Sequence, residues 1–316
     1  MSYRPPFPFR YRHIMTMFPT LFRKISLNYE RKRLITPDDD FIDIDFLKND
    51  NDRLVIICHG LEGSSDSIYV KGMAKAFQSR KWDVAAYNYR CCSGEVNKQF
   101  RVYHAGATDD LHFVIEEILK NTTYKSVALV GFSLGGNLIL KYLGENPALV
   151  PKTITSAVAL SAPVDLESCS VEIIKRHNFI YNRRFMGKLK VKIRAKRAQI
   201  EANGIKVKPI LKARLLTDFD ELFTAPAHQF KNAVDYWRKN SAKQFLHQIK
   251  IPTLLINALD DPFLAKEAFP YEIAQQNSAF YLSTPKYGGH CGFVQFNKEK
   301  EYWSEVETTK FITQHG

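Results

Sequence analysis

The sequence lacks a hydrophobic run long enough to cross a bilayer. Its longest stretch free of Asp, Glu, Lys and Arg is the 15 residues from Ser126 to Leu140, whereas a membrane-spanning helix needs about 18 or more. The first eight residues contain three prolines and an arginine, where a secretory signal peptide requires an unbroken apolar segment. These absences predict a cytoplasmic protein that is at most peripheral at a membrane.

Cysteine is scarce, and its spacing matches no metal site. The five cysteines are odd in number and show neither the spacing of a zinc site nor that of a secreted disulfide framework. The neighbours Cys91 and Cys92 could pair under oxidation, but reduced thiols are the default in cytosol. We therefore assign the cysteines no role and expect no metal.

Acidic residues are almost missing from the segment 175–214. It holds 14 Lys and Arg against one acid, which gives +13, so the other 31 basic and 32 acidic residues nearly cancel. Two interpretations of this segment, and of 188–197 above all, stay open. It forms a solvated helix face, or it is attracted to anionic lipid headgroups at about 1 kcal/mol per basic residue. Nucleic acid is not expected as a partner, because no recognised nucleic-acid motif is present.

Short apolar runs alternate with helical stretches along most of the 316 residues. The helices are expected at 67–79, 108–120, 135–144, 265–275 and 301–312. Buried runs separated by helices indicate an α/β fold with a mostly parallel sheet flanked by helices. The eight strands are expected at 32–36, 41–46, 54–58, 84–89, 127–130, 154–160, 254–258 and 279–282.

The alternation stops between residues 162 and 248. This stretch is too long for a plain loop in a compact domain, and its position between two core strands predicts a helical cap over the active site. Residues 1–30 are aromatic, basic and rich in proline. We expect them to form an N-terminal extension packed on a single domain that spans 1–316.

The motif Gly131-Phe132-Ser133-Leu134-Gly135 matches G-x-S-x-G, the nucleophile elbow of serine hydrolases. In such an elbow the serine sits on a sharp turn between a strand and a helix, and the glycines allow the two elements to come close. An apolar run precedes the motif and a helical stretch follows it. The pattern therefore predicts that Ser133 is a nucleophile.

The segment His59-Gly60-Leu61-Glu62-Gly63 follows the third expected strand. In this arrangement that loop supplies one backbone amide of an oxyanion hole, and the residue after the nucleophile supplies the other. The expected donors are the amides of Leu61 and Leu134, which would stabilise the charge of a tetrahedral intermediate.

An acid and a histidine follow the serine in the order that this fold requires. A late strand runs into Asp260 and Asp261, and either carboxylate could orient the histidine. The spacing from the strand end favours Asp261. His290 lies between glycines after the last short strand, so the expected triad is Ser133, Asp261 and His290.

His104 and Asp109 also match the H-x4-D spacing of some acyltransferases. Two residue types at one spacing carry little information. A structural contact near the start of a helix is the preferred interpretation of His104.

In these motifs the chain resembles the YheT-type α/β hydrolases, whose eukaryotic relatives include acylglycerol and phospholipid lipases. Cys91 departs from the pattern, because glycine is expected there. The resemblance runs from about Pro5 to the C-terminus and includes Pro5-Pro6-Phe7, His59 to Ser65, Asn88-Tyr89-Arg90, Cys92 to Glu95, Tyr103-His104, Gly131 to Asn137, Phe219-Asp220, Phe223 to Pro226, Asn257 to Phe263 and Gly288 to Phe293.

The resemblance implies an α/β-hydrolase fold and cofactor-free cleavage of a carboxylic ester by Ser133, Asp261 and His290. The substrate would be a small-molecule or lipid ester, with an acylglycerol among the candidates. Two alternatives stay open: acyl transfer by the same triad, and a binding or scaffold protein whose triad is inactive.

Overall fold

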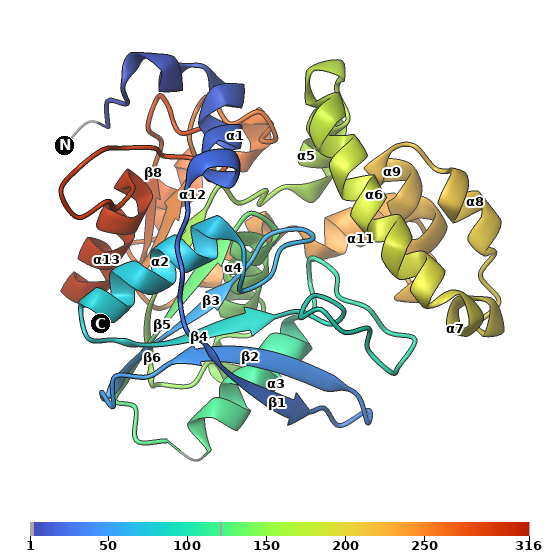
Figure 1. The fold of residues 1–316 in the computed structure, drawn as a ribbon, viewed down its shortest axis with the longest axis horizontal. Helices are drawn as coiled ribbons and strands as arrows, with labels where there is room; N and C mark the ends of the chain where they lie inside the picture. Colours follow the sequence, from blue (N-terminus) through green and yellow to red (C-terminus); the bar gives the residue numbers. More distant parts are fainter. Residues whose placement is uncertain (1–2, 121, 316) are drawn as a thin grey trace.

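The molecule is built around one twisted sheet of eight strands (Figure 1). The computed structural model describes residues 3–120 and 122–315. The strands follow one another across the sheet in the order β1-β2-β4-β3-β5-β6-β7-β8. Their bounds are β1 Glu30–Ile35, β2 Phe41–Leu47, β3 Arg53–Cys58, β4 Asp83–Asn88, β5 Ser126–Phe132, β6 Ile154–Leu160, β7 Thr253–Ile256 and β8 Phe280–Ser283.

Six of the strands run parallel to one another. The first two form an antiparallel hairpin, and β2 pairs antiparallel with β4. All pairs from β4 through β3 to β8 are parallel. The expected α/β-hydrolase architecture, a mostly parallel eight-stranded sheet, is confirmed.

Helices cover both faces of the sheet, because successive strand side chains point to opposite sides. In β3, Leu54 and Ile56 pack into one core, while Val55 and Ile57 pack into the other. The first core is covered by α3 (Thr108–Leu119), α4 (Leu134–Glu145) and α12 (Tyr271–Gln276). The second is covered by α1 (Arg12–Phe22), α2 (Ile68–Ser79) and α13 (Trp303–His315).

The helix expected over 265–275 is wrong as a single element. A short 3-10 turn, η6 (Lys266–Ala268), is separated from α12 by Phe269 and Pro270. A residue that precedes proline is disfavoured in the helical conformation, and Phe269 is indeed more extended, with φ −115° and ψ 84°. Pro270 therefore caps the second helix, which begins at Tyr271, instead of continuing the first.

Between β6 and β7 the chain forms a helical insertion with a core of its own, seen beside the sheet in Figure 1. The last part of the expected cap, the 3-10 segment η5 (Ala242–Gln248), packs instead into the main core, where Ala242 and Leu246 are fully buried. No helix of the described residues could span a membrane. The insertion's helices are α5 Leu166–Ile173, η3 Arg176–Asn178, α6 Phe179–Ala195, α7 Arg197–Ala202, α8 Val207–Lys212, α9 Leu216–Phe219, the π-helix η4 Asp220–Thr224, α10 Ala225–Ala227 and α11 Ala233–Asn240.

Candidate active site

Ser133 occupies a strained turn between β5 and α4. Its backbone has φ 53° and ψ −120°, a left-handed conformation that costs a non-glycine residue energy and often marks a functional site. A Cβ atom on Gly131 would lie 2.3 Å from the carbonyl oxygen of Gly135, and one on Gly135 would lie 2.5 Å from that of Cys58. Both glycines of the motif are therefore required by the close approach of strand and helix.

His290 and Asp261 meet beyond the carboxyl ends of β7 and β8. The Nδ1 atom of His290 lies 3.0 Å from one carboxylate oxygen of Asp261 and 3.1 Å from the other. The side chain of Asp261 is fully buried, and the backbone N–H of Phe263 donates to it over 2.9 Å. An acid held in this way fixes the tautomer and orientation of the imidazole.

The Asp261 carboxylate also sets the charge of His290. Burial lowers the pKa of His290, and the ring of Phe263 covers the imidazole in a tilted arrangement, with the ring centroids 4.3 Å apart. Asp261 and Cys291, through their charges and hydrogen bonds, together outweigh that burial and raise the pKa of His290 well above its ordinary value.

Asp260 has a different task from Asp261. Its Oδ1 atom accepts a hydrogen bond of 2.9 Å from the backbone N–H of Gly289, so it supports the loop that carries His290. Burial, with the charge of Asp261 adding to it, raises the pKa of Asp260 to about 6. Of the two competing aspartates, Asp261 is the one that the fold brings to the imidazole.

In the segment 60–63 of the loop, the Leu61 amide differs from its neighbours. The amides of Gly60, Glu62 and Gly63 each donate to a neighbouring group, whereas the Leu61 amide donates to no other described residue. Leu134 is the first residue of α4, and the first amides of a helix have no partner inside it. Both expected oxyanion donors are thus free to bind a ligand.

The N-terminal segment holds the histidine loop, a contact that the sequence reasoning missed. The hydroxyl of Thr16, on α1, accepts a hydrogen bond of 2.9 Å from the backbone N–H of His290. Met15 is fully buried, and its sulfur accepts from the N–H of Val294 at 3.2 Å. No local signal could have found a contact between residues 274 positions apart.

Replacement of Thr16 by valine should lower kcat/KM on a soluble ester about three- to tenfold. Valine removes the acceptor without changing the shape of the side chain, and a single hydrogen bond contributes about 0.5–1.5 kcal/mol. Thr16→Ser keeps the hydroxyl and should restore most of the rate. Steady-state kinetics of both variants, with thermal unfolding as a check on folding, test this; equal rates for valine and serine would contradict it.

Ser133 and His290 lie where an inner cavity meets an outer groove. The cavity, of about 160 Å³, extends beneath the insertion. The groove, of about 540 Å³, opens between α1 and α6. Five residues line both spaces: Leu61, Ser133, Phe185, Phe263 and His290.

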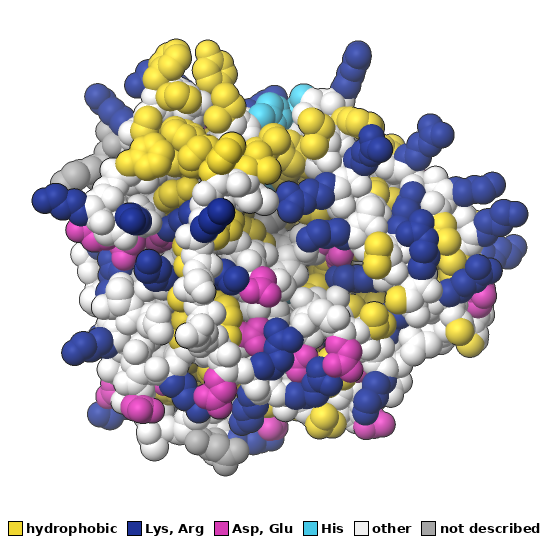
Figure 2. Space-filling view, viewed as in Figure 1, with side chains coloured by type: hydrophobic (Ala, Val, Ile, Leu, Met, Phe, Trp, Pro, Cys, Tyr) yellow, Lys and Arg dark blue, Asp and Glu magenta, His cyan; other side chains and the backbone are white. Residues whose placement is uncertain are grey.

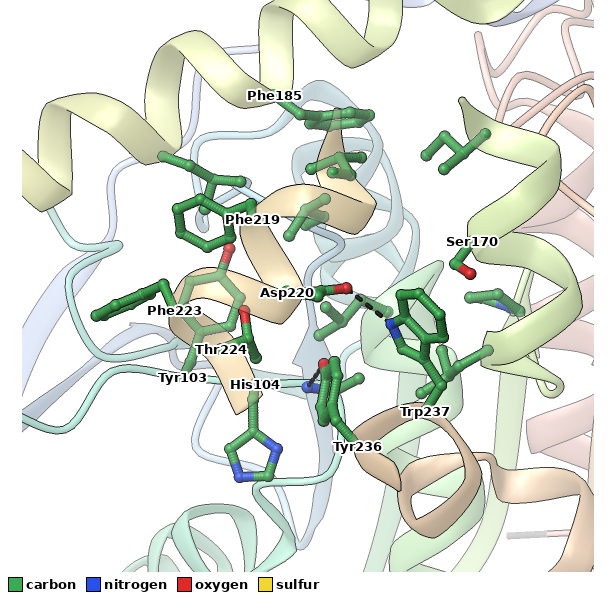
Figure 3. Close-up of a pocket in the computed structure, with 18 of the residues that line it drawn as sticks. Tyr103, His104, Ser170, Phe185, Phe219, Asp220, Phe223, Thr224, Tyr236 and Trp237 are labelled. Carbon is green, nitrogen blue, oxygen red and sulfur yellow. Dashed lines mark hydrogen bonds between the residues drawn. The ribbon is translucent and has the colours of Figure 1, made fainter. Parts of the chain in front are cut away.

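The inner cavity is mainly apolar, and several of its polar groups are already partnered (Figure 3). Asp220 accepts a 2.8 Å hydrogen bond from the indole N–H of Trp237, and burial raises the pKa of Asp220 to about 6. The Tyr236 hydroxyl accepts from the N–H of Ala105 at 3.1 Å. A bound ligand therefore meets hydrocarbon over most of this cavity.

The basic run 188–197 is not simply a solvated face. Lys188, Lys192 and Lys196 share one side of α6 and its end, and all three reach back to the hydrolase core. Lys188 donates to the backbone carbonyl oxygen of Glu62 over 2.9 Å, and Lys192 donates to the carboxylate of Glu62 over 2.7 Å. Lys196 is buried and donates to the carbonyl oxygen of Asn97 over 2.8 Å. The spacing of four residues places the three on one stripe of the helix.

The pair His104 and Asp109 is not brought together. Asp109 is bound by Arg101 at 2.7 Å. His104 accepts from the N–H of Gly106, and its ring lies tilted against that of His228, with the centroids 4.4 Å apart.

Cys91 departs from the family pattern at a position that favours glycine. Its φ of 63° is left-handed, which explains why glycine is expected there.

Comparisons with known proteins agree with this architecture. The α/β-hydrolase fold family matches residues 53–295. The protein YheT of Escherichia coli K12 is 35% identical, over 89% of this chain and 84% of its own. Phospholipase ABHD3 of Bos taurus is 27% identical, over 94% of this chain and 75% of its own. The Pyrococcus furiosus esterase Pf2001 shares the fold with a TM-score of 0.61 at 16% identity, covering 91% of each chain. The chain therefore belongs to the α/β-hydrolase fold family and, within it, to the group that contains YheT.

Proposed function

We propose that the protein is a serine hydrolase of carboxylic esters that works through an acyl-enzyme. The observation that carries the proposal is that Ser133 and His290, the latter paired with Asp261, both line the place where the outer groove meets the apolar cavity. A nucleophile, a base and an orienting acid are the groups that ester cleavage requires.

In the first half of the reaction His290 accepts the proton of Ser133 while the serine oxygen attacks the ester carbonyl. The tetrahedral oxyanion receives hydrogen bonds from the amides of Leu61 and Leu134. His290 then gives its proton to the departing alcohol, and the acyl group stays on Ser133. The Asp261 carboxylate stabilises the imidazolium that exists between these two steps.

In the second half, water takes the place of the alcohol. His290 deprotonates this water, which attacks the acyl-enzyme, and collapse of the second intermediate releases the acid and restores Ser133. Acyl transfer would differ only in the acceptor, an alcohol or thiol in place of water. Product analysis with added acceptor separates the two, and an inactive scaffold would give no product of either kind.

The substrate class follows from the two spaces on either side of Ser133. The apolar inner cavity, with the insertion acting as its cap, suits a hydrocarbon acyl chain, and the outer groove leaves room for a larger alcohol. Because a relative is named phospholipase ABHD3, we extend the proposal to lipid esters.

The test is a ladder of p-nitrophenyl esters from acetate to palmitate. The value of kcat/KM should rise from acetate as each methylene enters the cavity, at most by about 0.8 kcal/mol per group, and should stop rising when the cavity is full. If wild type and a Ser133→Ala variant released p-nitrophenol at the same rate, the proposal would be overturned.

Filling the far end of the cavity should shorten the preferred chain. Ile200 lines the cavity from α7, at the outer end of the insertion in Figure 1, and is fully buried. An Ile200→Phe variant should lose rate on the longest ester that wild type accepts, while the rate on acetate should stay within about twofold because the reacting atoms are untouched.

Ile210→Phe is the matched control. Ile210 is equally buried in the core of the same insertion but does not line the cavity. Both changes overpack the insertion at a cost of about 1–3 kcal/mol, so a shift of chain preference in both variants alike would contradict the assignment of Ile200.

A further inference from the structure

One face of the molecule exposes apolar side chains from two segments far apart in the sequence. Figure 2 shows hydrophobic atoms gathered over α1 and continuing toward the start of α6, with histidine between them. We call this surface the α1–α6 face. It includes the exposed residues Phe7, Tyr11, Ile14, Leu21, Phe179 and Ile180.

Helix α1 is apolar on both of its sides, which is unusual for a surface helix. Met15 and Pro19, one turn apart, are buried against the core. Ile14, Met17 and Leu21 occupy the opposite side, and Leu21 is 60% exposed. Packing within the chain accounts for the first set and leaves the second in contact with solvent.

The two segments form one surface. The Nδ1 atom of His13, on α1, lies 3.2 Å from the hydroxyl of Tyr181, on α6, and its ring centroid lies 6.1 Å from that of His177. Burial lowers the pKa of His13, so this bridge is neutral near pH 7. The exposed side chains of α1 and of the start of α6 can therefore meet the same flat partner.

The charge of this face is mainly positive, and its nearby acid Glu172 is paired with Lys175. Residues 3–29 contain Arg4, Arg10, Arg12, Arg23 and Lys24 but no acid. Arg23 is paired with Glu305, while the other four form no ion pair with any described carboxylate. Exposed side chains at the start of α6 continue the pattern without a described acidic partner: Arg176, Arg183 and Arg184.

The outer groove opens through this face. Met17 and Leu21 line one side of the groove, Arg184 and Lys188 line the other, and Ser133 lies at its inner end. The same groove is lined by Glu62, which is paired with Lys192, and by Asp66, which is paired with Lys71. A molecule that entered from the surface would pass exposed hydrocarbon and then these charged groups, with Arg184 and Lys188 as the cations without a carboxylate partner among the described residues, before it reached the serine.

We propose that the α1–α6 face docks the protein on an anionic phospholipid surface. Its apolar side chains lie in the headgroup and acyl boundary, its arginines contact the lipid phosphates, and the groove opens onto the lipid. The docking itself does not require the proposed ester hydrolysis, although that activity explains why the groove leads to Ser133.

The test is cosedimentation of the full chain with vesicles. Wild type should bind vesicles of phosphatidylcholine and phosphatidylserine, should bind pure phosphatidylcholine more weakly, and should be released as salt screens the charges. The double variant Ile14→Asp with Ile180→Asp should bind at least tenfold more weakly. In a second double variant, Arg10→Gln with Arg183→Gln, binding should weaken by up to roughly twenty-five-fold, at about fivefold per basic residue.

Ile35→Asp is the matched control, because Ile35 is 61% exposed and Ile180 64%, and Ile35 lies on the edge strand β1, away from this face. The control should bind like wild type. The proposal would be overturned if the control and the Ile14/Ile180 variant bound equally, or if wild type did not bind. It would also be overturned if wild type were a dimer and the Ile14/Ile180 variant a monomer. Turnover of a soluble short-chain ester, measured alongside, reports the hydrolase activity separately.

Discussion

Replacement of Ser133 by alanine should reduce ester turnover by about 10⁵–10⁶-fold and leave the protein folded. The change removes the atom that attacks the substrate, and loss of a serine nucleophile costs this much when the rest of the site is intact. The residual rate should come from the oxyanion donors and from substrate binding alone. Alanine should not increase strain, because Ser133 already holds a left-handed backbone conformation with a Cβ atom.

A fluorophosphonate probe makes this prediction independent of the choice of ester. Folded wild type should be labelled once, at Ser133, and the alanine variant should not be labelled. A probe that labels neither protein would favour an inactive scaffold, and equal labelling of both would place the nucleophile at another residue.

The sheet could be predicted from the sequence because its signals are local. Each parallel strand is a short apolar run next to a helical stretch, and the eight expected strands match the observed ones within a few residues. The broken helix at Pro270 was also readable, since proline disfavours a helical residue before it. The pattern on both sides of Pro270 nevertheless suits a helix, so periodicity alone predicts one continuous element there.

The approach of α1 to the site could not be predicted in this way. Thr16 and His290 are neighbours only because the first helix packs over the last loops, and no periodic pattern records a contact of that range. The lysine stripe on α6 was hidden for another reason. Basic residues occupy several sides of that helix, so Lys192 could not be told from its solvated neighbours until the position of Glu62 was known.

Asp261→Asn should lower kcat by about 10⁴-fold, the size of effect seen when an asparagine holds a catalytic histidine in the wrong tautomer. Asp260→Asn is the matched control, one residue away with the same change of atoms. An asparagine at 260 can still accept a hydrogen bond from the N–H of Gly289 through its side-chain oxygen. The kcat of Asp260→Asn should therefore fall by no more than about tenfold. A larger loss at 260 than at 261 would reverse the roles of the two acids.

The pH dependence of kcat/KM tests the same assignment through the charge of His290. The imidazole must be neutral to accept the serine proton, so activity is lost as pH falls through its pKa. Because Asp261 and Cys291 together raise that pKa against the effect of burial, the acidic limb of wild type should lie above the ordinary histidine value of about 6.5. In Asp261→Asn the raising charge is gone while burial still favours the neutral ring, so the limb should move to lower pH as the plateau falls. In Asp260→Asn the limb should stay near its wild-type position, and a shift in that variant instead would contradict the pairing of His290 with Asp261.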